Sequence, residues 1–537
     1  MAHLLGIDVG TTGAKALLIA HDGRVVASAT TEYPMFTPQP LWAEQNPTDW
    51  WAATVTSIRQ VLAHSDLTPE QVAGVGLTGQ MHGLVLLNAQ GEALRPCIMW
   101  NDQRTATQCA DITRQVGAAN VLRLTGNRVL PGFTAPKIAW VRDHEPDVYR
   151  QIAKVLLPKD YVRYRLTGDY FSEVSDASGT SLFDVGRRRW SDEMFKAMEL
   201  PRWWLPEVTE SPVVSARVSA SAARQTGLLA GTAVVGGAGD QAAQAVGTGI
   251  VAEGIVSATI GTSGVVFAAC EAYRVEPQGR LHAFCHAVPG MWHLMGVMLS
   301  AGGCLRWYRD ALGDLEKAQA GEMGRDPYDL LTKAAAQVPA GCEGLVFLPY
   351  LSGERTPYPD PNARGVFFGL TLRHGKAHLT RAVLEGVTYG LRDSLELMRD
   401  LGLSVQQVRA SGGGARSPLW RQILADLFGT EIVTVNVTEG AAYGAALLAA
   451  VGAGVYGSVP EACQAAIRLV EHTVPGPAMA VYADYYPRYR ALYPALAPEF
   501  EAMAAVVSKH LVWREQLAVD LENAERPPAD EVDARHL

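Results

Sequence analysis

The chain opens with short apolar runs separated by polar turns. Apolar residues dominate "LLGIDVG" and "AKALLIA", the tip "GTTG" lies between them, and "HDG" leads into a third run. Runs of this length, bounded by glycine-containing turns, are typical of β-strands joined in hairpins. The pattern predicts a β-meander. Two interpretations of its first tip stay open: an ordinary polar turn, or a phosphate cradle in which glycines let backbone N–H groups approach an anion.

The same pattern returns in the second half of the chain. "DVGTTG" at residues 8–13 has a counterpart in "TIGTSG" at residues 259–264, with Thr259 in the place of Asp8. Two such hairpins predict a duplicated domain with one loop in each half. Facing loops would grip a polyphosphate from both sides, and the single acid, Asp8, would suit a divalent cation held on one side.

Two later stretches show helical patterns beside glycine. Residues 406–429 predict a strand, a glycine turn and an amphipathic helix that begins near Pro418. Residues 440–457 form a small, apolar run broken by glycines. This run is typical of a helix packed closely on its neighbour rather than of a membrane span.

Residues 73–105 predict two strands, with "GQMHG" between them and "MWNDQR" after them. Strand ends and loops are where side chains meet small polar ligands. A structural histidine and a simple Asp102–Arg104 pair are the plainer alternatives. The residues placed at these positions are Met81, His82, Trp100, Asn101, Asp102 and Arg104.

The stretch "VVGGAGDQAAQAVGTG", residues 234–249, has Asp240 as its one ionisable side chain. Aspartate in a glycine-rich turn commonly caps a helix N-terminus. The alternative is a proton acceptor whose small neighbours let two substrates approach it. The stretch by itself leaves both interpretations open.

Composition narrows the class of protein. At 537 residues the chain exceeds a single hydrophobic core, which predicts two large domains. Hydrophobic residues make up 48% and charged residues 19%, as in ordinary globular proteins. The formal charge of −9 argues against a general nucleic-acid surface. The first residues lack a basic leader and a cleavage pattern, so no secretory signal is expected.

The cysteines indicate a reducing compartment. All seven lie outside any C-x-x-C pair, which also argues against a structural zinc site. One tract, "HAFCHAVPGMWH", contains His282, Cys285, His286 and His293. Packing in a short apolar strand is favoured over metal binding there, because the tract lacks a recognisable zinc spacing.

Taken together, these motifs resemble the FGGY family of carbohydrate kinases, and within it the bacterial enzymes that act on xylulose. The similarity runs nearly collinearly from residue 3 to about residue 495. Its motifs are "GIDVGTTGAKALL", "PLWAEQNPTDWW", "GLTGQMHGLVLL", "MWNDQRT", "PGFTAPKIAWVRDHEP", "VLLPKDYVRYRLTGDY", "GAGDQAAQAVGTG", "IGTSGVVF", "FLPYLSGERTPYPDPNARGVFFGL" and "SGGGARSPLWRQILAD".

The resemblance implies an α/β fold of two actin-like, ribonuclease-H-like domains that flank a deep cleft. The expected boundaries are 1–246 for the domain with the sugar site and first phosphate hairpin, 247–500 for the nucleotide-binding domain, and 501–537 for a C-terminal extension. In that extension, residues 508–524 are expected to be helical, and the charged, Pro-containing residues 525–537 are expected to form a solvated, mobile tail.

The resemblance also implies the reaction and its partners. The expected activity transfers the γ-phosphate of ATP to the 5-hydroxyl of D-xylulose with Mg²⁺, in the cytoplasm, with neither nucleic acid nor membrane as a partner. Family members often form dimers, although the sequence identifies no interface. Two alternatives stay open: a kinase for another pentulose or polyol such as ribulose or glycerol, and an actin-like ATPase that regulates a partner.

Site residues follow from the matching motifs. Asp240 is the expected catalytic base, and Asp8 is the expected metal ligand. Gln241 stands where the family usually has Asn, and Ser417 stands where many relatives have Asn, so both contacts are less securely transferred. The expected substrate-binding residues are Met81, His82, Asp240 and Gln241. The expected nucleotide-binding residues are Gly10, Thr11, Thr12, Lys15, Thr262, Gly302, Gly413, Gly414 and Ser417.

Overall fold

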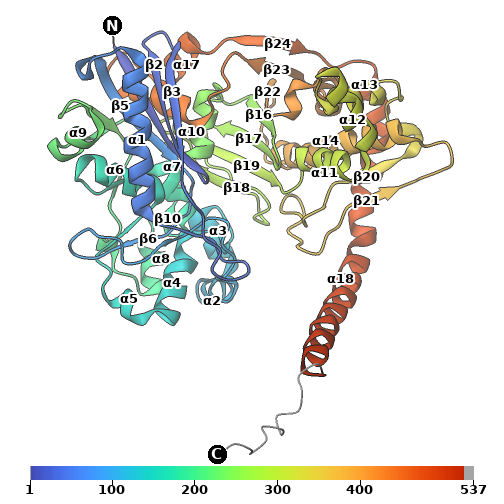
Figure 1. Ribbon diagram of the computed structural model, residues 1–537, viewed down its shortest axis with the longest axis horizontal. Helices are drawn as coiled ribbons and strands as arrows, with labels where there is room; N and C mark the ends of the chain where they lie inside the picture. The colour runs from blue at the N-terminus through green and yellow to red at the C-terminus, as the bar shows by residue number, and fades with distance from the viewer. Residues whose placement is uncertain (1, 525–537) are drawn as a thin grey trace, which may run out of the picture.

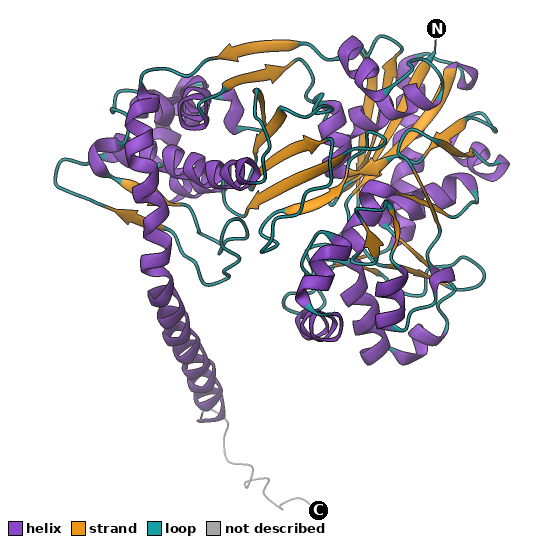
Figure 2. Ribbon diagram, turned by 180° about the vertical axis from the view of Figure 1, so that it is seen from behind, coloured by secondary structure: helices purple, strands orange, loops and turns teal. Residues whose placement is uncertain are grey.

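The computed structural model describes residues 2–524, with side chains described as far as residue 510. The chain forms two α/β halves, each built on a seven-stranded sheet, and a long helix, α18 (Ala478–Ala524), runs out from the second half (Figures 1 and 2). The helix expected over residues 508–524 is confirmed as the end of α18. Helix α18 is continuous across residue 501, where the C-terminal extension was expected to begin. The expected tail at residues 525–537 lies outside the described residues.

The first sheet confirms the predicted meander. Its order is β13-β14-β5-β1-β2-β3, with β15 beside β5. β1, β2 and β3 are antiparallel neighbours, whereas β5 runs parallel to β1, and β14 runs parallel to β5. The strands are β1 (His3–Val9), β2 (Gly13–Ala20), β3 (Val25–Glu32), β5 (Val72–Gly79), β13 (Val214–Arg217), β14 (Ala233–Val235) and β15 (Ala238–Gly239).

The second sheet repeats this topology, as the duplicated hairpins predict. Its order is β18-β19-β17-β16-β22-β23-β24. β16, β17 and β19 are antiparallel neighbours, and β22 and β23 continue in parallel from β16. The strands are β16 (Ile255–Ile260), β17 (Gly264–Cys270), β18 (His282–Cys285), β19 (Trp292–Met298), β22 (Gln407–Ser411), β23 (Glu431–Val435) and β24 (Leu469–Thr473).

Helices cover both sheets, and short two-stranded ribbons lie outside the two sheets (Figure 1). The remaining helices are α1 (Pro47–Ser65), α2 (Ala106–Val116), α3 (Ala118–Thr125), α4 (Thr134–His144), α5 (Pro146–Arg150), α6 (Pro158–Thr167), α7 (Val174–Ala177), α8 (Asp192–Met198), α9 (Ala220–Thr226), α10 (Asp240–Gly247), α11 (Gly302–Leu312), α12 (Asp314–Met323), α13 (Pro327–Ala335), α14 (Lys376–Asp400), α15 (Pro418–Phe428), α16 (Ala441–Gly452) and α17 (Val459–Ala466). The ribbon strands are β4 (Glu44–Gln45), β6 (Val85–Leu87), β7 (Cys97–Ile98), β8 (Lys154–Leu156), β9 (Phe171–Glu173), β10 (Phe183–Asp184), β11 (Arg189–Trp190), β12 (Glu207–Thr209), β20 (Val346–Leu348) and β21 (Val366–Phe368).

The glycine-rich helix α16 joins the two halves by close packing. It lies on the first sheet, where a Cβ added at Gly6 would sit 2.0 Å from the carbonyl oxygen of Ala442. It also crosses α10, where a Cβ added at Gly444 would sit 1.8 Å from the carbonyl oxygen of Ala243. The predicted close-packed helix is therefore confirmed. Within the described part of the chain, no helix has both the length and the apolar character needed to cross a bilayer.

The histidine-containing tract belongs to the core, as the packing interpretation predicts. His293 stacks on Phe267 with ring centroids 4.2 Å apart, and His282 stacks on Phe284 at 5.5 Å. Burial lowers the pKa of His282 to about 3 and that of His286 to about 4, so both rings are neutral near pH 7. Among the described residues, no group of three or more His, Cys, Asp or Glu is placed to hold a metal ion.

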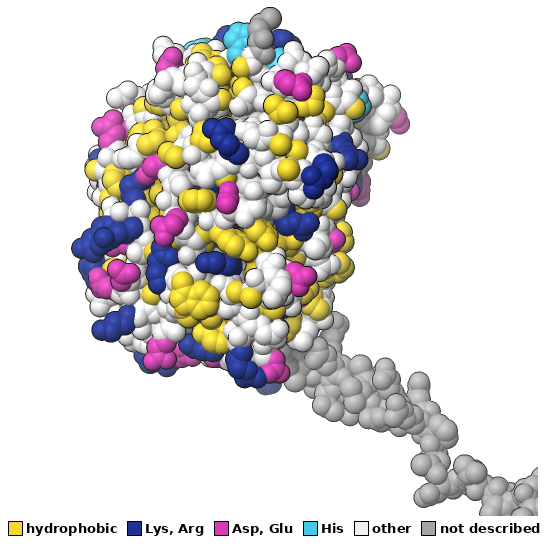
Figure 3. All heavy atoms as spheres, turned by 90° about the vertical axis from the view of Figure 1, so that its left-hand side faces the viewer, with side chains coloured by type: hydrophobic (Ala, Val, Ile, Leu, Met, Phe, Trp, Pro, Cys, Tyr) yellow, Lys and Arg dark blue, Asp and Glu magenta, His cyan; other side chains and the backbone are white. Residues whose placement is uncertain are grey.

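The face of the molecule that lies on the left in Figure 1 is drawn in Figure 3. Basic and acidic side chains are interspersed across it, with small apolar areas between them. Mixed charge of this kind is typical of an ordinary solvated surface.

Candidate active site

Three strand ends bring the predicted chemical groups to one edge of the first sheet. β1 and β15 both run parallel to β5, with Asp8 in register with Thr78, and Gly239 in register with Gly79. Asp8 therefore lies beside the segment that follows β5, and Asp240 begins α10 on the other side of that segment. Carboxyl ends of parallel strands are the usual ligand-binding edge of an α/β sheet.

Asp240 is the first residue of α10, and Gly239 occupies the N-cap position. Burial raises the pKa of Asp240 from 3.8 to about 7, and the nearby charge of Asp8 also raises it, against hydrogen bonds from Gln241. The small neighbours have a steric role, since a Cβ at Gly239 would lie 2.9 Å from the sulfur of Met81. Small residues here thus let the loop that contains Met81 approach the carboxylate.

Asp8 is a second carboxyl group with an altered pKa. Burial raises its pKa from 3.8 to about 6, and the charge of Lys15 opposes that rise. Its Oδ1 atom is buried without a hydrogen-bond partner among the described residues. Lys15, directly opposite Asp8 in the β1–β2 register, pairs with Glu439, which precedes α16. The first hairpin is therefore tied to the second half of the chain.

The first hairpin has its carbonyl groups occupied. Tyr33 Oη donates to the carbonyl of Gly10 at 2.5 Å, and Gln45 Nε2 donates to that of Thr11 at 2.7 Å. The backbone N–H of Tyr33 donates to the carbonyl of Thr12 at 3.2 Å. Among the described residues, the N–H groups of Thr11 and Thr12 have no hydrogen-bond acceptor. Donors left free beside occupied acceptors form an anion cradle, which favours the phosphate interpretation of this turn.

The second hairpin is arranged in the same way by the start of α11. The N–H of Gly302 donates to the carbonyl of Gly261 at 2.8 Å, and the N–H groups of Ala301 and Gly303 donate to that of Thr262 at 2.9 and 3.0 Å. A Cβ at Gly302 would lie 2.5 Å from the carbonyl oxygen of Gly261, so a glycine is needed for this approach. Gly302 therefore allows the start of α11 to pack closely against the second hairpin, which sets the shape of this loop.

A cavity of about 460 Å³ brings the predicted nucleotide residues of the second half together. The turn after β22 forms one wall, and the start of α11 forms another. Ser417 also caps α15, where its Oγ accepts a hydrogen bond from the N–H of Trp420 at 3.3 Å. The predicted residues that line this cavity are Thr262, Gly302, Gly413, Gly414 and Ser417. Gly10, Thr11, Thr12 and Lys15 belong to the first hairpin instead.

Met81 and His82 follow the end of β5. Met81 is 5% exposed and packs with Phe133, whereas His82 is half-buried, with its ring 4.5 Å from that of Phe133. Burial lowers the pKa of His82 well below its usual value, and Lys137 adds to that effect. Gln241, one residue into α10, is also half-buried. The structure thus places Met81, His82, Asp240 and Gln241 around one strand end.

The "MWNDQR" segment has a mainly structural role. Asp102 is fully buried and forms an ion pair with Arg104 at 2.7 Å, which confirms the simple pair. Asp102 also accepts a hydrogen bond from the N–H of Ala43 at 2.7 Å. Trp100 has a different contact, because its Nε1 donates to Thr11 Oγ1 at 3.1 Å. It therefore links this loop to the first hairpin.

Comparisons with known proteins agree with this geometry. Models of the FGGY family of carbohydrate kinases match residues 3–247 with the N-terminal domain and residues 256–453 with the C-terminal domain. The chain belongs to the FGGY family of carbohydrate kinases. Its two sheets are those of the two-domain, actin-like fold of FGGY kinases.

Three relatives illustrate the similarity. The chain is 44% identical to the xylulose kinase of Escherichia coli over 498 residues, which cover 92% of this chain and 99% of that protein. The crystal structure of a xylulose kinase from Brucella ovis is 40% identical and covers 92% of this chain and 99% of its own, with a TM-score of 0.84. The gluconokinase of Bacillus subtilis is 33% identical and covers 83% of this chain and 87% of its own length.

Several residues that line the cavity beside the second hairpin were not among the predicted site residues, although Arg416 and Trp420 lie within the family motif at residues 411–426. They come from α11, from α13, from the turn before α15 and from α15 itself, which are separate segments of the chain that all line the cavity. A proline after an aspartate cap predicts the start of α13, as observed at Asp326, but says nothing about what the helix faces. The added lining residues are Arg306, Tyr328, Asp329, Thr332, Arg416 and Trp420.

The residues present fit a magnesium ion delivered with a nucleotide. Asp8 offers a buried carboxylate oxygen that lacks a hydrogen-bond partner among the described residues. Mg²⁺ typically binds through one or two carboxylates, with phosphates and waters completing its shell. A single acid beside a phosphate cradle therefore suits this ion.

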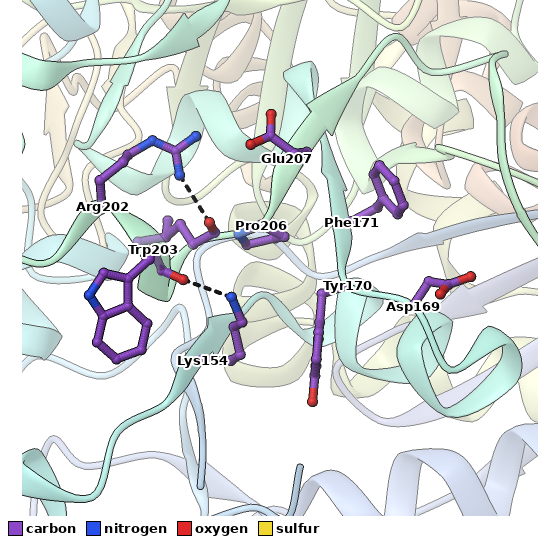
Figure 4. A pocket seen from close by; sticks show the side chains of 9 residues that line it. Lys154, Asp169, Tyr170, Phe171, Arg202, Trp203, Pro206 and Glu207 are labelled. Carbon is purple, nitrogen blue, oxygen red and sulfur yellow. Dashed lines mark hydrogen bonds between the residues drawn. The ribbon is translucent and has the colours of Figure 1, made fainter. Parts of the chain in front are cut away.

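A second cavity, of about 770 Å³, shares no lining residue with the site (Figure 4). Its two basic residues are held by backbone carbonyl groups. Lys154 Nζ donates to the carbonyl of Trp203 at 2.7 Å, and Arg202 Nη1 donates to that of Leu205 at 2.9 Å. These hydrogen bonds to backbone carbonyl groups give the two basic residues a structural role at this cavity.

Proposed function

We propose that this FGGY kinase transfers the γ-phosphate of ATP to the 5-hydroxyl of D-xylulose and forms D-xylulose 5-phosphate. The observation that carries the proposal is its 44% identity, along almost all of both chains, to the E. coli xylulose kinase. The segment with Met81 and His82 follows the central strand β5, with Asp240 on one side of it and the first hairpin on the other, and this arrangement supports the same reaction.

In this proposal Asp240 is the general base. Its carboxylate takes the proton of the sugar 5-hydroxyl, the oxygen attacks the γ-phosphorus, and the bond to the β-phosphate oxygen breaks to release ADP. A base with a pKa of about 7 accepts that proton effectively near neutral pH. The reaction otherwise needs alignment and charge stabilisation rather than covalent chemistry from the protein.

The two hairpins and Lys15 supply that stabilisation in the proposal. Free N–H groups of Thr11 and Thr12 donate to the transferring phosphate, and Lys15 contributes positive charge. Thr262, Gly413, Gly414 and Ser417 line the nucleotide cavity. Asp8 would hold Mg²⁺ directly or through water, and the bound ion would neutralise charge on the phosphates.

The deciding experiment measures ADP release by the purified protein with a panel of acceptors. We expect kcat/KM for D-xylulose to exceed that for D-ribulose and L-ribulose by roughly ten- to hundredfold, because an inverted hydroxyl leaves a buried polar group unpaired. Glycerol should be poorer still, since it lacks contacts that hold the reacting hydroxyl in line. A higher kcat/KM for another acceptor would contradict the xylulose assignment and leave the kinase assignment standing.

Gluconate is the second candidate substrate. The 33% identity to the Bacillus gluconokinase favours its inclusion in the panel. Its carboxylate separates it from xylulose, so a gluconate kinase would discriminate strongly between the two.

A cytoplasmic location belongs to the same proposal, because ATP is an intracellular substrate. Fractionation of the producing cells would test it. The homodimer that the resemblance implies can be tested by light scattering of the purified protein.

A further inference from the structure

His82 has an unusual backbone conformation for its residue type. Its φ angle is +71°, in the left-handed region that non-glycine residues seldom occupy. Such conformations persist where surrounding contacts hold them, and they cluster at ligand sites. The contacts that hold His82 therefore matter to the sugar site.

The ring of His82 is fixed from one side by the segment after α7. Its Nδ1 atom lies 2.8 Å from the carbonyl oxygen of Gly179. A Cβ at Gly179 would lie 2.2 Å from both Nδ1 and Cε1 of the ring, so a glycine is needed for this contact. The ring of Phe133 packs at 4.5 Å.

This contact determines which ring nitrogen carries the proton. A carbonyl oxygen can only accept, so Nδ1 must be the N–H donor. Because the ring is neutral near pH 7, Nε2 carries a lone pair. Within the described residues, no hydrogen bond occupies Nε2. It is therefore an acceptor, which suits a hydroxyl group that donates its hydrogen.

The main chain of His82 is held by the start of α4. Lys137 Nζ donates to the carbonyl of His82 at 3.0 Å and to that of Gly132 at 2.7 Å. Thr134 Oγ1 donates to the same carbonyl of His82 at 3.1 Å. Two side chains of α4 thus hold the carbonyl group of the residue with the unusual φ.

Lys137 is an unusual lysine, because it is fully buried and forms no ion pair within the described part of the chain. Burial lowers its pKa to about 7, which nearby Cys97 and Asp102 oppose. An amine donates hydrogen bonds in either protonation state, so its contacts to the two carbonyl groups survive a change of charge. A buried amine is costly unless its hydrogen bonds are needed.

We propose that Lys137 is a positioning residue for sugar binding. It holds the His82 backbone so that Nδ1–H faces Gly179 and Nε2 accepts a hydrogen bond from a hydroxyl of the substrate. The inference rests on the proposed function for the identity of that substrate. The tautomer of His82 and the role of Lys137 in fixing that tautomer do not depend on which substrate binds.

The central test is Lys137→Met, which keeps the length of the side chain and removes its donors. We expect KM for D-xylulose to rise by roughly ten- to hundredfold, because a loosened His82 loses its hydrogen bond to the sugar. KM for ATP should change by less than about twofold, since no nucleotide contact is altered. Lys154→Met is the matched control, because Lys154 also donates to a backbone carbonyl but lies at the cavity of Figure 4.

A second readout does not depend on the substrate. Spectra that correlate ring protons with nitrogens in ¹⁵N-histidine-labelled protein report the tautomer, and His82→Gln assigns the signal. We expect Nδ1–H in the wild-type protein and a mixture of tautomers in Lys137→Met. If the wild type fails to phosphorylate xylulose but shows this pattern, the proposed function fails and the role of Lys137 in fixing the tautomer stands.

Two further variants cover the case in which Lys137→Met does not fold. Thr134→Val removes the other donor to the His82 carbonyl. Gly179→Ala places a Cβ against the His82 ring and so displaces Nδ1 from the carbonyl of Gly179. Both should raise the sugar KM in the same direction. An Nε2–H tautomer in the wild type would overturn the proposal. An unchanged sugar KM in a folded Lys137→Met variant would also overturn it. If Lys137→Met does not fold, an unchanged sugar KM in both Thr134→Val and Gly179→Ala would overturn it instead.

Discussion

Burial changes the chemistry of two carboxyl groups at this site. It raises the pKa of Asp240 to about 7 and that of Asp8 to about 6. The charge of Asp8 adds to the rise at Asp240, whereas the charge of Lys15 opposes the rise at Asp8. Asp240 lies beside the loop of Met81 and His82, whereas Asp8 lies beside the first hairpin and Lys15. Two similar side chains thus have different expected roles because of where the fold places them.

Replacement of the proposed base tests the chemistry directly. Asp240→Asn keeps the size of the side chain and removes the proton acceptor, so kcat should fall by roughly 10²–10⁴-fold. ADP release measures turnover, and calorimetric titration measures whether sugar and nucleotide still bind. Asp169→Asn, at the cavity of Figure 4, is the control and should keep wild-type turnover. Near-normal turnover of Asp240→Asn would exclude Asp240 as the base.

The raised pKa of Asp240 also predicts a pH dependence. The base is active when deprotonated, so kcat/KM should rise with pH and level off above about pH 7. Stability has the opposite trend. Between pH 3.8 and about 7 the folded state holds this proton more tightly than the unfolded state, so Asp240 lowers stability as pH rises through that window. Asp240→Asn should therefore raise Tm relative to wild type at pH 8 and not at pH 4. An equal difference in Tm at both pH values would contradict this.

At the scale of elements, helix α16 fixes the geometry between the halves by close backbone contact. Its glycine and alanine residues let it pack on α10 and on β1 without intervening side chains. Residues without bulky side chains also shape the proposed nucleotide cavity, where glycines of the turn after β22 form part of the wall. Different glycines therefore have different tolerances to substitution.

The crossing of α10 and α16 should not tolerate a methyl group. Gly444→Ala would place a Cβ 1.8 Å from the carbonyl oxygen of Ala243, and we expect a loss of roughly 1–3 kcal/mol in the free energy of unfolding. Gly321→Ala in α12 is the matched control. It meets nothing within 4 Å and should be neutral or stabilising by up to about 1 kcal/mol. Urea unfolding compares them, and equal midpoints would contradict the packing argument.

The nucleotide cavity should respond differently at Gly413. A Cβ built there has no neighbour within 4 Å, so the fold has room for a side chain that would occupy the cavity. Gly413→Leu should raise KM for ATP by at least about tenfold. Tm and the sugar KM should stay close to wild type. Normal ATP kinetics in this variant would place the nucleotide elsewhere.

At the scale of the whole molecule, the two halves are joined by the Lys15–Glu439 pair and by α16 on the first sheet. Movement of one half against the other would exclude water from the phosphate, which is the usual role of closure in kinases. The first turns of helix α18 pack against the second half, and only its later part runs away from the two halves in Figures 1 and 2.

Truncation should separate the kinase core from the end of the chain. Deletion of residues 525–537 should leave kcat within about twofold of wild type, because every residue named at the proposed site precedes residue 440. Deletion from residue 478 is the contrasting variant. It removes Tyr482, Tyr486 and Tyr489, which are buried in the second half, and should prevent folding. A large loss of turnover in the shorter deletion, with folding preserved, would contradict the prediction.

Local pattern determined much of this fold. The hairpin at residues 8–13, its counterpart at 259–264 and the strand, turn and helix over 406–429 could all be predicted, because strand and helix periods and glycine turns act over short distances along the chain. The repeat also indicated two related halves. Motif matches extended this to the candidate site residues, whose roles remain predictions.

Only the tertiary structure decided how distant segments meet. Lys15 and Glu439 are 424 positions apart, and His82 and Gly179 are 97 positions apart, so neither contact has a local pattern. The pKa values of Asp8 and Asp240 depend on burial and on the charges that the fold brings near them. The cavity beside the second hairpin gains Arg306 and Tyr328 from separate helices. Sequence periodicity specifies which face of an element is buried, whereas desolvation, tautomer and cavity shape depend on what the folded chain packs against that face.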